Sequence, residues 1–270
     1  MSGESRSTGI LLVGHGTRDK LGTREFLRQT ETLSAMTTLP VQPAFLEFQS
    51  PTIGEAWTWL ASRGVRRILV TPLLLFAAGH AKSDIPEAIE AARVQTPEID
   101  VRYTRPLSRC RPLVDRVLQC VLSQEAASLL HDAPRVGRGG GGSSFRDGDS
   151  DRCGLLMVGR GSHDPCARTD MRVLTELIRH RTTFEEVRTA FYAMAEPKLP
   201  EVLGEMAASG LDRILVHPHL LFHGRLDQAI RRQCDEVAGQ HPNVKIRVGP
   251  YLGPTTEIAA AILHRLDQID

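Results

Sequence analysis

The sequence contains no apolar run approaching the length of about 18 residues that a membrane-spanning helix needs. Its formal net charge is only +1, so no excess of either sign indicates binding to nucleic acid or to an anionic membrane. The N-terminal stretch MSGESRSTG lacks the hydrophobic segment of a secretory signal peptide. We therefore expect a cytoplasmic protein whose partners include neither a membrane nor a nucleic acid.

Cysteines are few, and no two of them are spaced as a C-x-x-C pair. This pattern favours neither a disulfide framework nor an iron–sulfur or structural zinc site. The apolar fraction of 41% and the charged fraction of 24%, in a chain of 270 residues, are typical of a globular protein with one large or two ordinary domains. The five cysteines are Cys110, Cys120, Cys153, Cys166 and Cys234.

What the sequence does contain is an internal repeat. The segment LLVGHGTRD at 11–19 returns as LMVGRGSHD at 156–164. Residues 44–76, which begin AFLEFQSPTI, align without a gap with residues 190–222, which begin AFYAMAEPKL. A repeat of this length indicates two homologous structural units.

A glycine-rich segment separates the two copies. Its Gly, Ser, Arg and Asp residues offer too little apolar surface to pack, which is typical of a flexible linker. We therefore predict an N-terminal domain at 1–132, a linker at 133–151 and a C-terminal domain at 152–270.

Short runs of strand-forming residues alternate with helical patterns in each copy, which predicts an α/β fold of two tandem parallel sheets with helices on both faces. Ligands bind such sheets beyond the carboxyl ends of the strands, so the residues that follow each strand are the candidates for function. The predicted strands are 9–14, 41–48, 65–75 and 99–107 in the first copy and 153–158, 187–193, 211–221 and 244–252 in the second.

Three polar residues at these strand ends occur only in the first copy. His15 follows the first strand, Glu47 lies at the end of the second, and His80 lies in the loop after the third. The second copy has Arg160 in place of His15, Ala193 in place of Glu47, and a shorter loop without a counterpart of His80. Because the surrounding residues are retained, this joint loss favours a functional role over a structural one.

Two imidazoles and a carboxylate suit Fe²⁺, Co²⁺ or Ni²⁺, and the same groups accept protons. The second copy has histidines of its own, His217, His219 and His223. No carboxylate accompanies them in the sequence, so buried structural histidines are the favoured interpretation and a second metal site is the alternative.

The segments LLVGHGTRD, FLEFQSPTI and PLLLFAAGHAKSDIPEAI resemble the motifs of the sirohydrochlorin chelatase family, the class II cobalto- and ferrochelatases of the CbiX and SirB type. The resemblance covers both halves and implies a double-length, chelatase-like member, a monomer that acts as a pseudo-dimer. It implies that His15, His80 and Glu47 are catalytic and handle the metal.

The same resemblance implies a lyase that inserts Fe²⁺ for sirohaem, or Co²⁺ for cobalamin, into sirohydrochlorin, with the metal as substrate and no tightly bound cofactor. The sequence lacks the histidine-rich tail and terminal M-x-C-x-x-C of some cobalt-inserting members, which favours iron.

A substrate rich in carboxylates calls for cationic partners, and arginine binds carboxylates through two hydrogen bonds at once. We predict that Arg18, Lys82, Arg160 and Arg225 bind the substrate; solvated surface residues are the alternative. Two other functions stay open at this point. One is a metal or tetrapyrrole carrier without turnover, and the other is an α/β enzyme that acts on small anions held by Arg18 and Arg160.

Overall fold

The computed structural model of the protein describes residues 7–76, 83–131 and 152–269, without the side-chain environments of 124–131. The candidate residues His80 and Lys82 and the predicted linker at 133–151 lie outside the described residues.

Each half of the chain forms a four-stranded sheet in which all neighbouring strands are parallel, which confirms the predicted fold class. The central strands are almost wholly buried, as expected for apolar runs covered on both faces. The first sheet has the order β2-β1-β3-β4, from β1 (Thr8–Gly14), β2 (Val41–Phe45), β3 (Arg67–Pro72) and β4 (Asp100–Tyr103). The second has the order β6-β5-β7-β8, from β5 (Cys153–Gly159), β6 (Glu186–Phe191), β7 (Arg213–Pro218) and β8 (Lys245–Val248).

Helices connect the strands and begin and end at residues with clear local signals. Thr52 caps α2 through a capping box with Glu55, and Gly64 follows that helix at φ 76°, the left-handed conformation that glycine adopts at helix ends. The helices are α1 (Lys20–Ala35), α2 (Ile53–Ser62), α3 (Ile85–Arg93), α4 (Arg111–His131), α5 (Pro165–Arg179), α6 (Leu199–Ala208), α7 (Arg225–Gln240) and α8 (Thr256–Leu266).

Six of the eight strands end earlier than predicted, and β2 and β3 of the first half show why. The run at 41–48 leaves the sheet after Phe45, whose N–H donates to the carbonyl of Pro51 at 2.8 Å as the chain turns. The run at 65–75 leaves it after Pro72, although Leu73 is still buried. These trailing apolar residues line a cavity rather than extend the ladder, so hydrophobicity alone overestimates the strand length.

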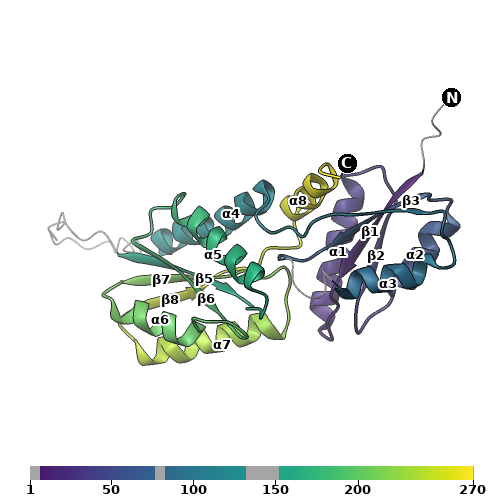
Figure 1. The fold of residues 1–270 in the computed structure, drawn as a ribbon. Coiled ribbons are helices and arrows are strands. Elements are labelled where there is room, and N and C mark those ends of the chain that lie inside the picture. The colour runs from purple at the N-terminus through teal and green to yellow at the C-terminus, as the bar shows by residue number, and fades with distance from the viewer. Residues whose placement is uncertain (1–6, 77–82, 132–151, 270) are drawn as a thin grey trace.

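The last helix of each half packs against the sheet of the other half. The helix α4 contacts β7 and α5, whereas α8 contacts β3 and α1, and Figure 1 shows α4 beside the second sheet and α8 beside α1. Arg116 of α4 donates to the carbonyl of Leu252 at 2.8 Å, and Arg265 of α8 donates to that of Leu107 at 2.8 Å. The two halves are therefore interlocked by an exchange of helices.

One apolar core runs through both halves. It joins residues of β1, α1, α4, β5, α5 and α8, among them Leu12, Leu113, Met157 and Ile262, all of them inaccessible to solvent. Two further clusters lie under α2 and α3 in the first half and under α6 and α7 in the second. The inner faces of the two sheets thus share one core, and each outer face has its own.

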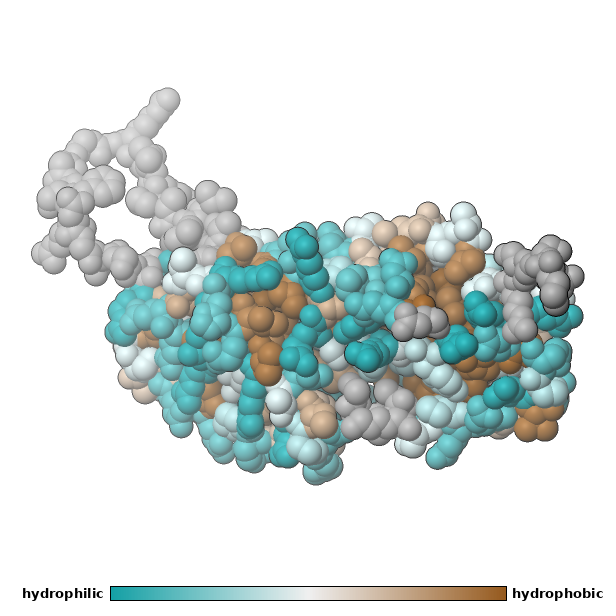
Figure 2. Space-filling model, turned by 45° about the horizontal axis from the view of Figure 1, so that its top comes forward, coloured by the Kyte–Doolittle hydropathy of each residue, from teal (hydrophilic) through white to brown (hydrophobic). Residues whose placement is uncertain are grey.

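The face of the molecule shown in Figure 2 is mostly hydrophilic, with apolar side chains in separate patches. None of the helices in the described part of the chain is both long and apolar enough to span a bilayer.

The shared core predicts that a cavity in the exchanged helix weakens the whole chain. We expect Leu113→Ala, at a fully buried position of α4, to lower the free energy of unfolding in urea by about 2–5 kcal/mol, in one cooperative transition. The control Leu122→Ala, on the same helix but 43% exposed, should change it by less than about 0.5 kcal/mol. Equal effects of the two variants would contradict the shared core.

Candidate functional site

The ends of the first two strands in each half are joined by the same backbone hydrogen bond. The N–H of Glu47 donates to the carbonyl of His15 at 3.0 Å, and the N–H of Ala193 donates to the carbonyl of Arg160 at 2.9 Å. The frame is therefore the same in both halves, and only the side chains that it presents differ.

A glycine makes this frame possible in both halves. Gly16 has φ 91° and Gly161 has φ 89°, a conformation that residues with a Cβ rarely adopt. A Cβ on Gly16 would overlap the carbonyl oxygen of Glu47, and one on Gly161 would overlap that of Ala193. The glycine thus fixes how closely the two strand ends approach each other.

The hydroxyl and carboxylate of the GTRD and GSHD motifs build the turn into the next helix. Thr17 Oγ1 accepts from the N–H of Asp19 at 3.1 Å, and Ser162 Oγ accepts from that of Asp164 at 3.0 Å. Asp19 caps α1 and Asp164 caps α5. The hydrogen bond from the Gly22 N–H, followed by that with His223, lowers the pKa of Asp19. These motif residues therefore have a structural role.

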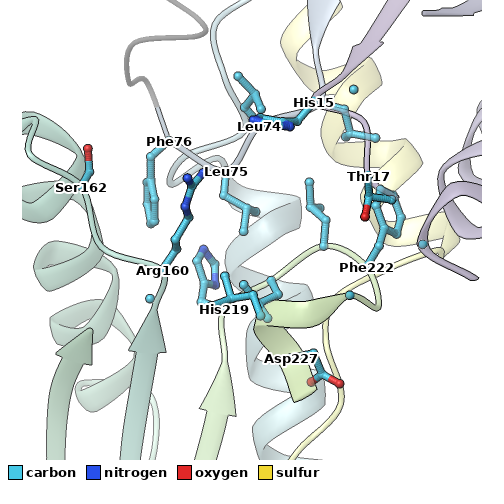
Figure 3. Close-up of a pocket in the computed structure, with 18 of the residues that line it drawn as sticks. His15, Thr17, Leu74, Leu75, Phe76, Arg160, Ser162, His219, Phe222 and Asp227 are labelled. Atoms are coloured by element: carbon cyan, nitrogen blue, oxygen red, sulfur yellow. The ribbon is translucent and has the colours of Figure 1, made fainter. Parts of the chain in front are cut away.

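The carboxyl edges of the two sheets face each other across a cleft of about 1010 Å³, at the upper end of the usual range for small-molecule sites. Equivalent loops of the two halves line it. Figure 3 shows His15 and Thr17 on the loop after β1, and Arg160 and Ser162 on the matching loop after β5.

His15 lies at the rim of this cleft and is partly buried. Its Nδ1 is 3.1 Å from the carbonyl oxygen of Gly16, a contact in which a neutral imidazole donates from Nδ1 and carries its lone pair on Nε2. The ring centroid of Phe48 is 6.5 Å away. The backbone thus holds the imidazole in an orientation suited to accepting a proton or binding a metal.

The structure brings Glu47 beside His15 only through the backbone. The residue is exposed, and its side chain is not among those that line the cleft. No group of three or more His, Cys, Asp or Glu residues within the described ranges is arranged to hold a metal ion. Because His80 lies outside those ranges, the three-residue metal site stays a prediction.

The predicted substrate-binding arginines Arg18, Arg160 and Arg225 all line the cleft and are exposed. A fourth, Arg168 on α5, also lines it, and the sequence analysis missed it because the equivalent residue of the first copy, Thr23, is uncharged. None of these four guanidinium groups forms an ion pair with any residue that the structure describes.

Three carboxylates line the cleft, and each already has a partner. Asp84 accepts from Oγ of Ser83 at 3.0 Å. Asp227 is 3% exposed and its carboxylate accepts from Nε of Arg231 through both oxygens, at 3.1 and 3.0 Å. Asp164 caps α5. The unpaired charge that the described residues present to the cleft is therefore mainly positive.

The histidines of the second half do not converge on a metal site. His217 and His219 are 1% and 2% exposed, and none of their ring nitrogens has a hydrogen-bond partner among the described residues. Nδ1 of His223 instead lies 3.1 Å from Oδ1 of Asp19, the N-cap residue of α1. The backbone N–H of His223 donates to Glu25 at 2.7 Å. The interpretation as buried or edge histidines is supported.

Three further residues line the cleft, of which the sequence singled out only His219, and that one as a buried histidine or a metal ligand. Phe48 and Met194 occupy equivalent positions of the repeat, and His219 lies beneath Arg160 with its ring centroid 5.3 Å from that of Phe76. Only the equivalence of Phe48 and Met194 in the aligned copies was a usable signal, because both follow the second strand.

Two parallel sheets that face each other across a positively charged cleft, with a histidine at one strand end, define a two-lobed α/β protein whose cleft is suited to an anionic ligand. The chain belongs to the CbiX family, whose model matches it twice, at residues 9–124 and 154–269. The two matches confirm the internal repeat.

Relatives and solved structures support this assignment along the whole chain. The chain is 29% identical to a sirohydrochlorin ferrochelatase of Priestia megaterium, over 95% of this chain and 88% of that protein. It is 26% identical to a sirohydrochlorin cobaltochelatase of the same organism, over 96% and 79%. The structure of SirB from Bacillus subtilis with Fe³⁺ superimposes with a TM-score of 0.80, 27% identity and coverage of 97% and 95%.

The buried histidines predict a loss of stability in acid. Burial, and then the charge of Arg116, lowers the pKa of His217 to about 3, and burial, and then His217, lowers that of His219 to about 3. Below the ordinary value of 6.5 the unfolded chain binds more protons than the folded one, so stability is complete above pH 6.5 and falls towards pH 3. At pH 5 each of the two histidines lowers the free energy of unfolding by about 2 kcal/mol.

We expect His217→Leu to remove about half of this decline, measured as the free energy of unfolding in urea at pH 5 and pH 7. The control His180→Leu changes an exposed histidine and should leave the decline unchanged. A decline as steep in His217→Leu as in the unmodified protein would refute the assignment.

Proposed function

We propose that the protein is a sirohydrochlorin chelatase that inserts a divalent metal ion, Fe²⁺ or Co²⁺, into the tetrapyrrole and releases two protons. Membership of the CbiX family supports this, as do similar proteins named for iron and for cobalt insertion. The observation that carries the proposal is the cleft between the two halves, where His15 of one half faces an arginine-rich wall of the other. The metal is a substrate, and no tightly bound cofactor is required.

In this proposal His15 accepts a pyrrole proton or binds the incoming metal through Nε2. His80, which follows β3 in the sequence, is the second imidazole of the pair. Glu47 supplies the carboxylate that balances the charge of the metal or orients an imidazole, and its backbone is fixed beside that of His15.

The arginines bind the carboxylates of the substrate. Arg18, Arg160, Arg168 and Arg225 have no acidic partner among the described residues, so a bound carboxylate does not compete with an existing ion pair. Lys82, two residues after His80 in the sequence, is proposed to join them.

One chain supplies both walls of the cleft. We therefore propose that it works as a monomer, a pseudo-dimer of its two halves, and that it does so in the cytoplasm. The proposed division into 1–132, the linker 133–151 and 152–270 follows the repeat in the sequence, although α4 and α8 are exchanged in the packing.

The decisive measurement of this function is metal insertion under anoxic conditions, followed by the absorption of sirohydrochlorin with Fe²⁺ and with Co²⁺. Substoichiometric protein should give multiple turnovers above the spontaneous rate. His15→Ala should lower kcat by about 10²–10⁴-fold, and the control His180→Ala, at an exposed histidine on another surface, should not. Stoichiometric binding without acceleration would instead indicate a carrier.

The arginines of the cleft predict a kinetic effect different from that of His15. Arg160→Ala should raise KM for sirohydrochlorin about 5- to 50-fold, because a charge-assisted contact is lost in the ground state and the transition state alike, with kcat little changed. The control Arg111→Ala removes an 86% exposed guanidinium that is not among the cleft residues. A rise in KM of equal size in both variants would show a general charge effect and refute the local role.

A further inference from the structure

Two large side chains at equivalent positions of the repeat have left-handed backbones. Phe48 has φ 65° and Met194 has φ 54°, a region that is costly for residues with a Cβ and that glycine adopts freely. Such strained residues are typical of functional sites, where the surrounding structure imposes the conformation. The backbone conformation alone would favour glycine at both positions, not a large apolar residue.

Each of the two loops is fixed by polar contacts. The N–H of Gln49 donates to the carbonyl of Glu47 at 2.9 Å, which closes a three-residue γ-turn around Phe48, and Nε2 of Gln49 donates to the carbonyl of Thr17 at 2.9 Å. In the second half Nζ of Lys198 donates to the carbonyl of Ala195 at 3.0 Å, next to Met194.

The two apolar side chains are only partly packed. Phe48 is 54% exposed and Met194 is 36% exposed, so each leaves apolar surface in contact with water at a cost in free energy. Both line the cleft, one from each half. The stability of the fold therefore does not account for the exposed part of either side chain.

The surroundings indicate what covers them. The guanidinium of Arg18 lies 5.0 Å from the centre of the Phe48 ring, and the ring of His15 lies 6.5 Å from it. A flat apolar ring system with carboxylates at its edge matches this combination, because its face stacks on an aromatic ring while its edge meets the arginines.

We propose that Phe48 and Met194 form a clamp that holds the macrocycle of sirohydrochlorin between the two halves and sets it against His15. Phe48 stacks on the ring, and the flexible, polarisable thioether of Met194 adapts to it from the other half. This inference rests on the proposed function and deepens it by naming two residues that position the substrate.

The test uses the full chain and metal-free sirohydrochlorin, with Kd measured by fluorescence titration and kcat and KM by metal insertion. Phe48→Asn and Met194→Asn remove the apolar groups and keep a residue that tolerates the left-handed backbone. We expect Kd to rise roughly 10-fold for Phe48→Asn and roughly 5-fold for Met194→Asn, with kcat at saturation little changed and Tm not lowered. Phe48→Tyr, which retains the ring, should bind like the unmodified protein.

Val94→Asn is the matched control, since Val94 is 77% exposed and is not among the cleft residues. An unchanged Kd in both asparagine variants overturns the clamp. A raised Kd with a lowered Tm, shared by Phe48→Tyr, also overturns it, because it reports a damaged loop.

The fate of the chelatase proposal is read separately, from the unmodified protein. Acceleration of insertion together with unchanged Kd in the variants means that the clamp alone fails. Binding without acceleration, with Kd raised in the variants, means that the clamp holds in a carrier and the chelatase proposal fails. If the unmodified protein does not bind sirohydrochlorin at all, both fail.

Discussion

The exchange of the last helix between the two halves is the constraint on which the cleft depends. A parallel sheet presents its functional residues at one edge, and two such edges enclose a site only if the sheets cannot turn relative to each other. Here α4 covers the second sheet and α8 covers the first, and the inner faces share one apolar core. Rotation of one half would open that core, so the energy that folds the chain also fixes the width of the cleft.

Within this rigid arrangement the two halves have the same backbone conformation at the strand ends, but they carry different side chains there. The hydrogen bond between strand ends and the left-handed glycine recur in both. Because the backbone determines where a side chain emerges, His15 and Arg160 leave their strands at equivalent points of opposite walls. An exchange of imidazole for guanidinium therefore changes the chemistry of one wall without altering its shape.

The fold was predictable from the sequence because the two aligned copies show the same alternation of strand and helix patterns. Three features were not. Apolar residues after Phe45 and Pro72 resemble strand although they line the cleft, and the apolar face of α4 does not reveal which sheet it covers. The left-handed φ of Phe48 and Met194 leaves no trace in a non-glycine residue. Comparison of the copies found His15 and Arg160, but it overlooked Arg168, whose counterpart is uncharged.

A site that receives both a metal cation and a polyanion has to keep the two from interfering, since unscreened charges in a cleft act over several ångströms. Among the described residues, the cationic groups and the histidine come mainly from different halves of the chain. Arg160, Arg168 and Arg225 come from the second half, whereas His15 comes from the first. Arg18 is the cation of the first half whose guanidinium lies over the Phe48 ring, at 5.0 Å, where the aromatic face stabilises its charge. A macrocycle between these walls would meet its anion-binding groups mainly on one side and the proton acceptor on the other. In the proposed function, the replacement of His15 by Arg160 in the second copy lets the duplicated frame serve two kinds of charge.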